Sequence, residues 1–112
     1  MKVNWYDVEN FIKELAKEIP ANTSGVYGIP RGGLCLAVML SHKANIPLLL
    51  SPCPNCIVID DIADSGTTLL HYREKGYYIA TMHYFEKSKV VPDFWGTVKT
   101  EDDWVIYPWE EI

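Results

Sequence analysis

Apolar positions in the first segment of the chain recur at helical spacing. Between Asn4 and Ile19 they fall three and four residues apart, which predicts an amphipathic helix packed on a core. Asn4 has the side chain of a helix N-cap, Asp7 adds a negative charge in the first turn, and Pro20 ends the pattern. This segment is therefore expected to be structural.

In the rest of the chain, short apolar segments typical of strands alternate with longer segments typical of helices. They predict, in chain order, a strand at 26–29, a helix at 34–43, a strand at 46–50, a strand beginning at 57–59, a helix at 67–75 that Gly76 ends, a strand at 77–84 and two short strands near Thr97 and Val105. Strands that are apolar throughout and alternate with helices indicate a mainly parallel sheet with helices on both faces. We expect one three-layer α/β domain spanning residues 1–112.

Net charge, the length of apolar runs and the cysteine count narrow the possible classes of function. The formal charge of −5, without a basic stripe, argues against general nucleic-acid binding. No apolar run is long enough for a membrane span, and the first residues lack the pattern of a signal peptide. The three cysteines are an odd number, which argues against a disulfide framework, so a cytoplasmic protein is expected.

The stretch 58–68, VIDDIADSGTT, places three acids directly after an apolar strand. Asp60 and Asp61 stand where this strand is expected to leave the sheet, with their side chains on opposite faces. Carboxylates there can accept hydrogen bonds from a ribose diol or hold a hard cation. In the plainer interpretation they only solvate the end of a strand.

The second half of the stretch begins a helix and suits an anion. Unpaired N–H groups, the helix dipole, the small Gly66 and the neighbouring hydroxyl groups together form a cup for a phosphate. Asp64 would repel a phosphate, so it is expected to be a helix cap or an acid or base that faces a reacting group. A diol site beside a phosphate site predicts a sugar phosphate ligand. No P-loop and no GxGxxG spacing is present.

VIDDIADSGTT resembles the motif with which type I phosphoribosyltransferases bind 5-phosphoribosyl-1-pyrophosphate (PRPP). The segment 29–34, IPRGGL, resembles the pyrophosphate loop of that family. Phe85-Glu86-Lys87 and the tail 101–110, EDDWVIYPWE, are similar to the base-binding end of bacterial xanthine/guanine (6-oxopurine) enzymes. The resemblance covers nearly the whole chain and implies the type I phosphoribosyltransferase fold with a small C-terminal base-binding tail.

The resemblance also implies an activity. The phosphoribosyl group of PRPP would pass to a 6-oxopurine with release of pyrophosphate, a purine salvage reaction supported by Mg²⁺. Asp60 and Asp61 would contact the ribose hydroxyls and the Mg²⁺ shell, and Asp64 would be the general base. The PRPP phosphate would be held by Asp64, Ser65, Gly66, Thr67 and Thr68, the pyrophosphate by Arg31, Gly32 and Gly33, and the base by Lys87, Trp104 and Val105.

Plainer interpretations of these residues stay open. Lys87 can be an ordinary surface lysine, and Arg31 a turn residue. Trp104 and Trp109 can be core aromatics or contacts between subunits. The many aromatic residues favour a homo-oligomer, a dimer or a tetramer.

The sequence departs from the family in one place. The long mobile loop that normally precedes the PRPP motif is reduced to Ser51-Pro52-Cys53-Pro54-Asn55. A lid excludes water from the reacting centre, so its loss predicts weak turnover unless a neighbouring subunit covers the site. The alternative function is a PRPP- or nucleotide-binding regulatory module of the same fold.

The short segment contains a CxxC pair, Cys53 and Cys56. It can be half of a zinc site that two subunits complete, a redox pair, or a tight Pro-rich turn with incidental thiols, and the last is preferred because a lone CxxC is a weak signal. His83 lies in an apolar strand and is expected to be a core or site-edge residue.

Overall fold

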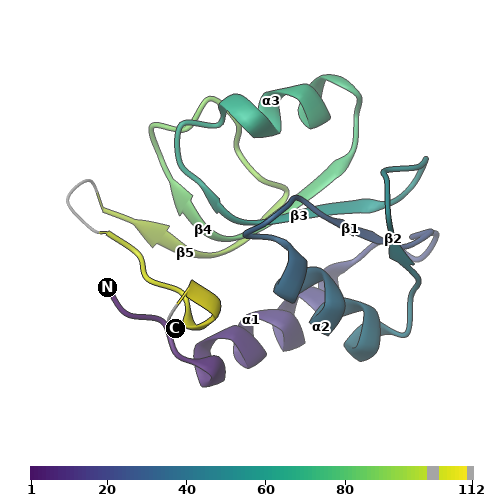
Figure 1. Ribbon diagram of the computed structural model, residues 1–112. Helices are drawn as coiled ribbons and strands as arrows, with labels where there is room; N and C mark the ends of the chain where they lie inside the picture. Colours follow the sequence, from purple (N-terminus) through teal and green to yellow (C-terminus); the bar gives the residue numbers. More distant parts are fainter. Residues whose placement is uncertain (101–103, 111–112) are drawn as a thin grey trace.

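The computed structural model describes residues 1–100 and 104–110 and contains one five-stranded sheet between helices (Figure 1). The elements are α1 (Trp5–Glu18), β1 (Val26–Gly28), α2 (Leu34–Ala44), β2 (Leu48–Leu49), β3 (Ile57–Ala63), α3 (Thr67–Glu74), β4 (Tyr78–Phe85), β5 (Phe94–Lys99) and the short 3-10 helix η1 (Pro108–Glu110). The strand order is β2-β1-β3-β4-β5, and every neighbouring pair is parallel. The expected α/β class is confirmed. No helix among the described residues is long and apolar enough to cross a membrane.

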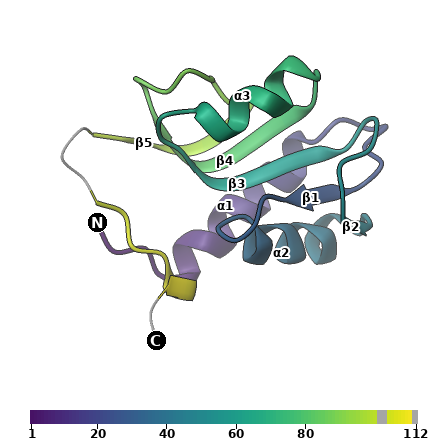
Figure 2. The ribbon, with the colours of Figure 1, turned by 45° about the horizontal axis from the view of Figure 1, so that its top comes forward.

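Helices cover both faces of the sheet, as Figure 2 shows. On one face α1 and α2 pack together, and their cluster of core side chains includes Leu15, Leu36 and Ile59. On the other face lie α3 and a second cluster, which includes Val58 and Leu69. The apolar runs of β3 and β4 are thus buried from both sides, which explains why their sequences lack alternation.

The first helix forms as its sequence predicts. The Asn4 side chain accepts a hydrogen bond from the Asp7 N–H (2.8 Å), and the Asp7 carboxylate accepts one from the Asn4 N–H (3.1 Å). This reciprocal capping box satisfies two N–H groups that otherwise have no partner in the helix. The buried face consists of Val8, Phe11, Ile12 and Leu15.

Two strands, β2 and β3, have other bounds than the sequence predicted. The strand expected at 46–50 is only Leu48–Leu49, because the Ile46 N–H still bonds to Ser41 O at the end of α2 and Pro47 has no N–H. β3 continues through Asp60 and Asp61 to Ala63, because pairing with β4 satisfies the backbone of these residues as well.

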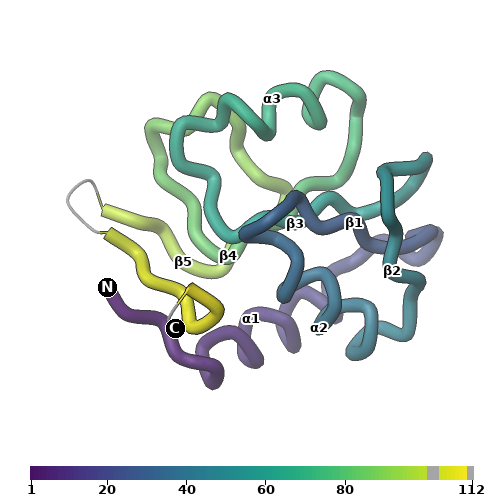
Figure 3. Tube along the Cα trace, in the orientation of Figure 1, coloured from purple at the N-terminus to yellow at the C-terminus, as the bar shows by residue number. Residues whose placement is uncertain are grey.

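Among the described residues, the tail forms one strand, β5, where the sequence predicted two. Val105 lies outside any strand, although the next residue, Ile106, makes an isolated parallel bridge with Lys2. The N-terminal residues and the tail therefore run side by side, as Figure 3 shows. The tail is fixed at this point by the beginning of the chain.

Candidate functional site

The loops after β1 and β3 meet at one edge of the sheet. The chain crosses from β1 to β2 in one direction and from β2 to β3 in the other, so the direction of winding reverses between β1 and β3. In open parallel sheets, ligands bind at the carboxyl ends of strands where this reversal occurs. A Cβ at Gly32 would overlap the Asp61 carboxylate, and one at Gly33 would overlap Ile59 O. The two glycines thus allow the 29–33 loop to pass directly against β3.

A small cavity of about 120 Å³ lies at the start of α3. Asp60 borders the cavity on one side. The loop before α3 and the first turn of α3, which the sequence predicts for a phosphate, border it on the other. Its lining consists of Asp60, Ile62, Asp64, Ser65, Gly66, Thr67, Thr68 and Leu69. This volume corresponds to roughly four water molecules, which is enough for a phosphate group.

Gly66 forms the cap of α3 in a backbone conformation that favours glycine. Its φ is 81°, and a Cβ there would lie 2.5 Å from Ser88 Oγ and 2.7 Å from Lys89 N. The cap makes no side-chain hydrogen bond to the helix. Asp64 is therefore not a helix cap, which corrects one of its two expected roles, and the connection 86–93 is packed against the anion loop.

The adjacent acids border different neighbours, although their carboxyl groups also interact with each other. Asp60 lines the small cavity, whereas Asp61 lies against Gly32. Burial, followed by the charge of Asp61, raises the pKa of Asp60 to about 8. Burial also raises the pKa of Asp61, and the charge of Glu110 adds to this shift. The expectation that the strand leaves the sheet at these two acids was wrong, because β3 continues to Ala63.

These two carboxylates fit a role as part of a divalent cation shell. Their oxygens are the hard ligands that Mg²⁺ prefers, and a cation would offset the burial of negative charge. Thr81, the cross-strand neighbour of Asp60, is also fully buried with no hydrogen-bond partner for its hydroxyl among the described residues. No group of three or more His, Cys, Asp or Glu in the described part of the chain could hold a metal alone. A cation here would complete its shell with oxygens of water or of a substrate.

A buried tyrosine links Asp61 to His83. The Tyr107 hydroxyl lies 3.0 Å from Asp61 O and 2.8 Å from His83 Nδ1. Because a carbonyl only accepts, Tyr107 donates its one proton to Asp61 O and accepts from the Nδ1–H of His83. Burial raises the pKa of Tyr107 and lowers that of His83, so both are neutral at pH 7. Sequence reasoning placed His83 in the core but missed Tyr107.

Asp64 has a basic partner that the sequence analysis also missed. Lys99 Nζ lies 3.3 Å from Asp64 Oδ1 and 5.4 Å from the centre of the Phe85 ring. The only available signal was the position of Lys99 near the end of the strand expected around Thr97. Its contact with Asp64 joins residues separated by 35 positions in the chain.

The three residues expected at the base lie near the carboxyl ends of β4 and β5 or in the tail. Lys87 is exposed in the connection 86–93, and Val105 is partly buried against the core. Trp104 is 79% exposed, which rules out its being a core aromatic, and its carbonyl accepts a hydrogen bond from Met1 N (2.8 Å). The resembling residues Glu101, Asp102 and Asp103 lie outside the described residues. Arg31, expected at the pyrophosphate, is exposed.

The cysteine pair forms a turn between β2 and β3. The Cys56 N–H bonds to Cys53 O (3.2 Å), and the Ser24 hydroxyl bonds to Pro54 O (2.8 Å). Cys56 is buried, which raises the pKa of its thiol and disfavours the reactive thiolate. These observations favour the structural interpretation of the pair over a redox one.

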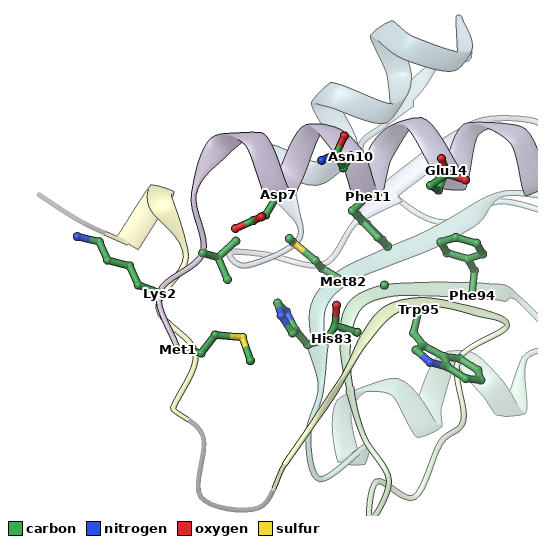
Figure 4. Close-up of a pocket in the computed structure, with 13 residues that line it drawn as sticks. Met1, Lys2, Asp7, Asn10, Phe11, Glu14, Met82, His83, Phe94 and Trp95 are labelled. Carbon is green, nitrogen blue, oxygen red and sulfur yellow. The ribbon is translucent and has the colours of Figure 1, made fainter.

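A larger cavity of about 550 Å³ lies between α1 and strands β4 and β5 (Figure 4). Its walls include Asp7 and Phe11 of α1 and Trp95 of β5, and it shares no lining residue with the cavity at α3. His83 borders it, so the hydrogen bonds through Tyr107 connect its wall to Asp61. The chemistry that the sequence predicts is nevertheless concentrated at the small cavity.

Comparison with solved structures decides the fold family. The crystal structure of a purine phosphoribosyltransferase from Pyrococcus horikoshii matches all of this chain and 95% of its own, with a TM-score of 0.86 and 26% identity. The fold is that of the type I phosphoribosyltransferases. The xanthine-guanine-hypoxanthine phosphoribosyltransferase of Helicobacter pylori matches 95% of this chain and 87% of its own, with a TM-score of 0.73 and 20% identity.

Sequence comparison agrees. The xanthine-guanine phosphoribosyltransferase of Idiomarina loihiensis is 23% identical over 138 residues, covering 96% of this chain and 85% of the relative. No family model matches the chain. The resemblance to the type I phosphoribosyltransferases is confirmed, and because the named relatives are phosphoribosyltransferases, the expected enzyme class is supported.

Proposed function

We propose that the protein is a Mg²⁺-dependent phosphoribosyltransferase that transfers the phosphoribosyl group of PRPP to a 6-oxopurine, with release of pyrophosphate. The observation that carries this proposal is the meeting of three features at one sheet edge. They are the Asp60–Asp61 pair, the cavity at the start of α3, and the glycine loop that passes Asp61. The purine enzymes among the similar proteins support the same chemistry.

In this proposal the 5′-phosphate occupies the small cavity and is bound by N–H groups and hydroxyls of residues 65–68. The ribose hydroxyls lie at Asp60 and Asp61, and the pyrophosphate lies along Arg31, Gly32 and Gly33. Mg²⁺, when bound, stabilises the negative charge of the departing pyrophosphate. Asp64 accepts the proton of the purine N–H as the base nitrogen bonds to C1′.

The purine would bind beyond the ends of β4 and β5. Trp104 offers an exposed aromatic face, Lys87 a donor for the 6-oxo group, and Val105 a backbone edge. One lysine contact accepts any 6-oxo group, so guanine, xanthine and hypoxanthine are all candidate substrates. The cytoplasm, where PRPP and free purines occur together, is the proposed location, with a homodimer or homotetramer as the proposed assembly.

A second candidate, a PRPP- or nucleotide-binding regulatory module, is favoured by one observation. The connection 50–56 between β2 and β3 is short, and none of its residues lines the cavity at α3. Such a site binds its ligand without excluding water from it, so binding without efficient transfer is the expected behaviour.

Calorimetric titration of PRPP, with and without Mg²⁺, tests the site first. Assays of nucleotide formation with guanine, xanthine and hypoxanthine then separate the two candidates. The transferase requires Mg²⁺-dependent binding and a nucleotide product. Binding without product favours the regulatory module, and no binding in either condition contradicts both. Asp64→Asn should lower turnover far more than PRPP affinity, and equal losses would contradict its role as the base.

A further inference from the structure

Lys99 is held in an unusual setting for a lysine. Its side chain is only 11% exposed, whereas lysine is almost never buried without a partner. The ammonium group lies over the Phe85 ring and 3.3 Å from Asp64 Oδ1. Both contacts fix the end of a side chain that is otherwise flexible and costly to immobilise.

The path of this side chain crosses the proposed site. Lys99 pairs with Phe85 in the β4–β5 register, and Ala63 pairs with Tyr84 in the β3–β4 register. Adjacent strands lie about 4.8 Å apart, so β3 and β5 are separated by about 10 Å. Lys99 therefore reaches over the carboxyl end of β4 to contact the residue that follows β3.

The Asp64 carboxylate is the other partner in this contact. It follows the end of β3, it does not cap α3, and its side chain is 58% exposed. Within residues 1–100 and 104–110, Lys99 provides the hydrogen bond and ion pair of its carboxylate. Without Lys99, a short exposed side chain would sample several rotamers.

We propose that Lys99 is the positioning residue for Asp64. This inference rests on the proposed function, in which a bond forms between the purine nitrogen and C1′ while the bond from C1′ to pyrophosphate breaks and its electron pair leaves with pyrophosphate. The purine N–H proton passes to the Asp64 carboxylate, and Lys99 keeps its own protons throughout. Lys99 holds the carboxylate in the orientation that receives the proton.

The chain contains a matched pair for comparison. Lys17 and Glu14 on α1 are also 3.3 Å apart, but their side chains are 70% and 64% exposed. Exposed pairs of this kind contribute little to stability or function. Lys17→Gln is therefore the control for Lys99→Gln, because it removes the same charge from a pair of the same length.

Steady-state kinetics with PRPP and guanine, xanthine or hypoxanthine, using whichever base gives product, test the proposal. Lys99→Gln should lower kcat roughly tenfold and change the KM for PRPP by less than about twofold, because positioning acts on the reacting step. Lys99→Met, which retains the apolar stem over Phe85, should behave alike, and Lys99→Arg should recover most of the loss. Lys17→Gln should match the wild type. Circular dichroism and thermal melting identify any variant that fails to fold.

A double-mutant cycle isolates the link to Asp64. If Lys99 acts through that carboxylate, Lys99→Gln causes no further loss in an Asp64→Asn background. The same fold loss in both backgrounds, unchanged kcat in Lys99→Gln and Lys99→Met, or a higher kcat would overturn the inference. A wild-type protein that forms no nucleotide removes the proposed function and the inference with it, whereas turnover that survives both variants removes the inference alone.

Discussion

Asp60 makes the stability of the protein fall as the pH rises, and one substitution should remove this dependence. Its pKa is raised from 3.8 to about 8. A carboxyl group whose pKa is higher in the folded chain keeps its proton up to a higher pH when the chain is folded. It therefore favours folding below its unfolded pKa and loses that contribution as the pH rises through about 8. Asp60→Asn removes this titration and should stabilise the protein in alkaline solution.

The size of the effect follows from the shift. Between pH 6.5 and 8.5 an unfolded Asp is fully ionised while Asp60 in the folded chain ionises, so the free energy of unfolding should fall by about 2 kcal/mol. For a chain of this length, this corresponds to roughly 8 °C in Tm. The lowered pKa of His83 acts in the opposite direction at the lower end of this window, where an unfolded His still binds protons, so the effect of Asp60 is measured as the difference in slope between Asp60→Asn and the wild type.

Urea unfolding followed by tryptophan fluorescence, in EDTA at pH 6.5, 7.5 and 8.5, measures this slope. Asp60→Asn should flatten it, whereas Glu14→Gln on the exposed face of α1 should retain the wild-type slope. The same Asp60→Asn protein should bind Mg²⁺-PRPP weakly, since a buried acid retained at a cost to stability indicates a functional group. A variant that keeps the wild-type slope, or is less stable at pH 8.5, would refute the reasoning.

Three further outcomes are expected. Gly32→Ala should abolish calorimetric binding of Mg²⁺-PRPP, because its Cβ would overlap the Asp61 carboxylate; retained affinity would contradict that placement. Trp104→Ala should raise the KM for the purine about tenfold with Tm within 2 °C of the wild type, because the ring is exposed; an unchanged KM would exclude stacking. Cys53→Ser should leave turnover unchanged and the protein should contain no stoichiometric zinc; bound zinc by elemental analysis would restore the metal interpretation.

The sequence pattern was sufficient to predict those elements whose structure depends on residues close together in the chain. The Asn4–Asp7 capping box and the helix of α1 follow from residues close together in the chain. The apolar residues of β3 and β4 are buried on both faces of the sheet, so the parallel sheet could be predicted too. The acidic and glycine-rich loops could be placed at one edge because parallel strands end there.

Long-range pairing explains what the sequence pattern missed. The apolar signal of β3 stops at Ile59, but its hydrogen bonds with β4 carry the strand through two acids. The contact between Lys99 and Asp64 requires β3, β4 and β5 to lie side by side. The contact between Tyr107 and Asp61 requires the tail to fold back across the sheet. Nothing in the spacing of these residues predicts such contacts.

The pairing of the first residues with the tail has a consequence for the order of folding. Met1 N–H bonds to Trp104 O, and Val3 N–H to Ile106 O, so contacts of the greatest sequence separation hold the end of the molecule that would receive the purine. Such contacts close the longest loop and are expected to form last and to open first. Among the hydrogen-bonded amides, exchange should therefore be faster at Val3 and Ile106 than in β3 and β4. The sugar-phosphate half of the site would remain formed while the half for the purine opens and closes.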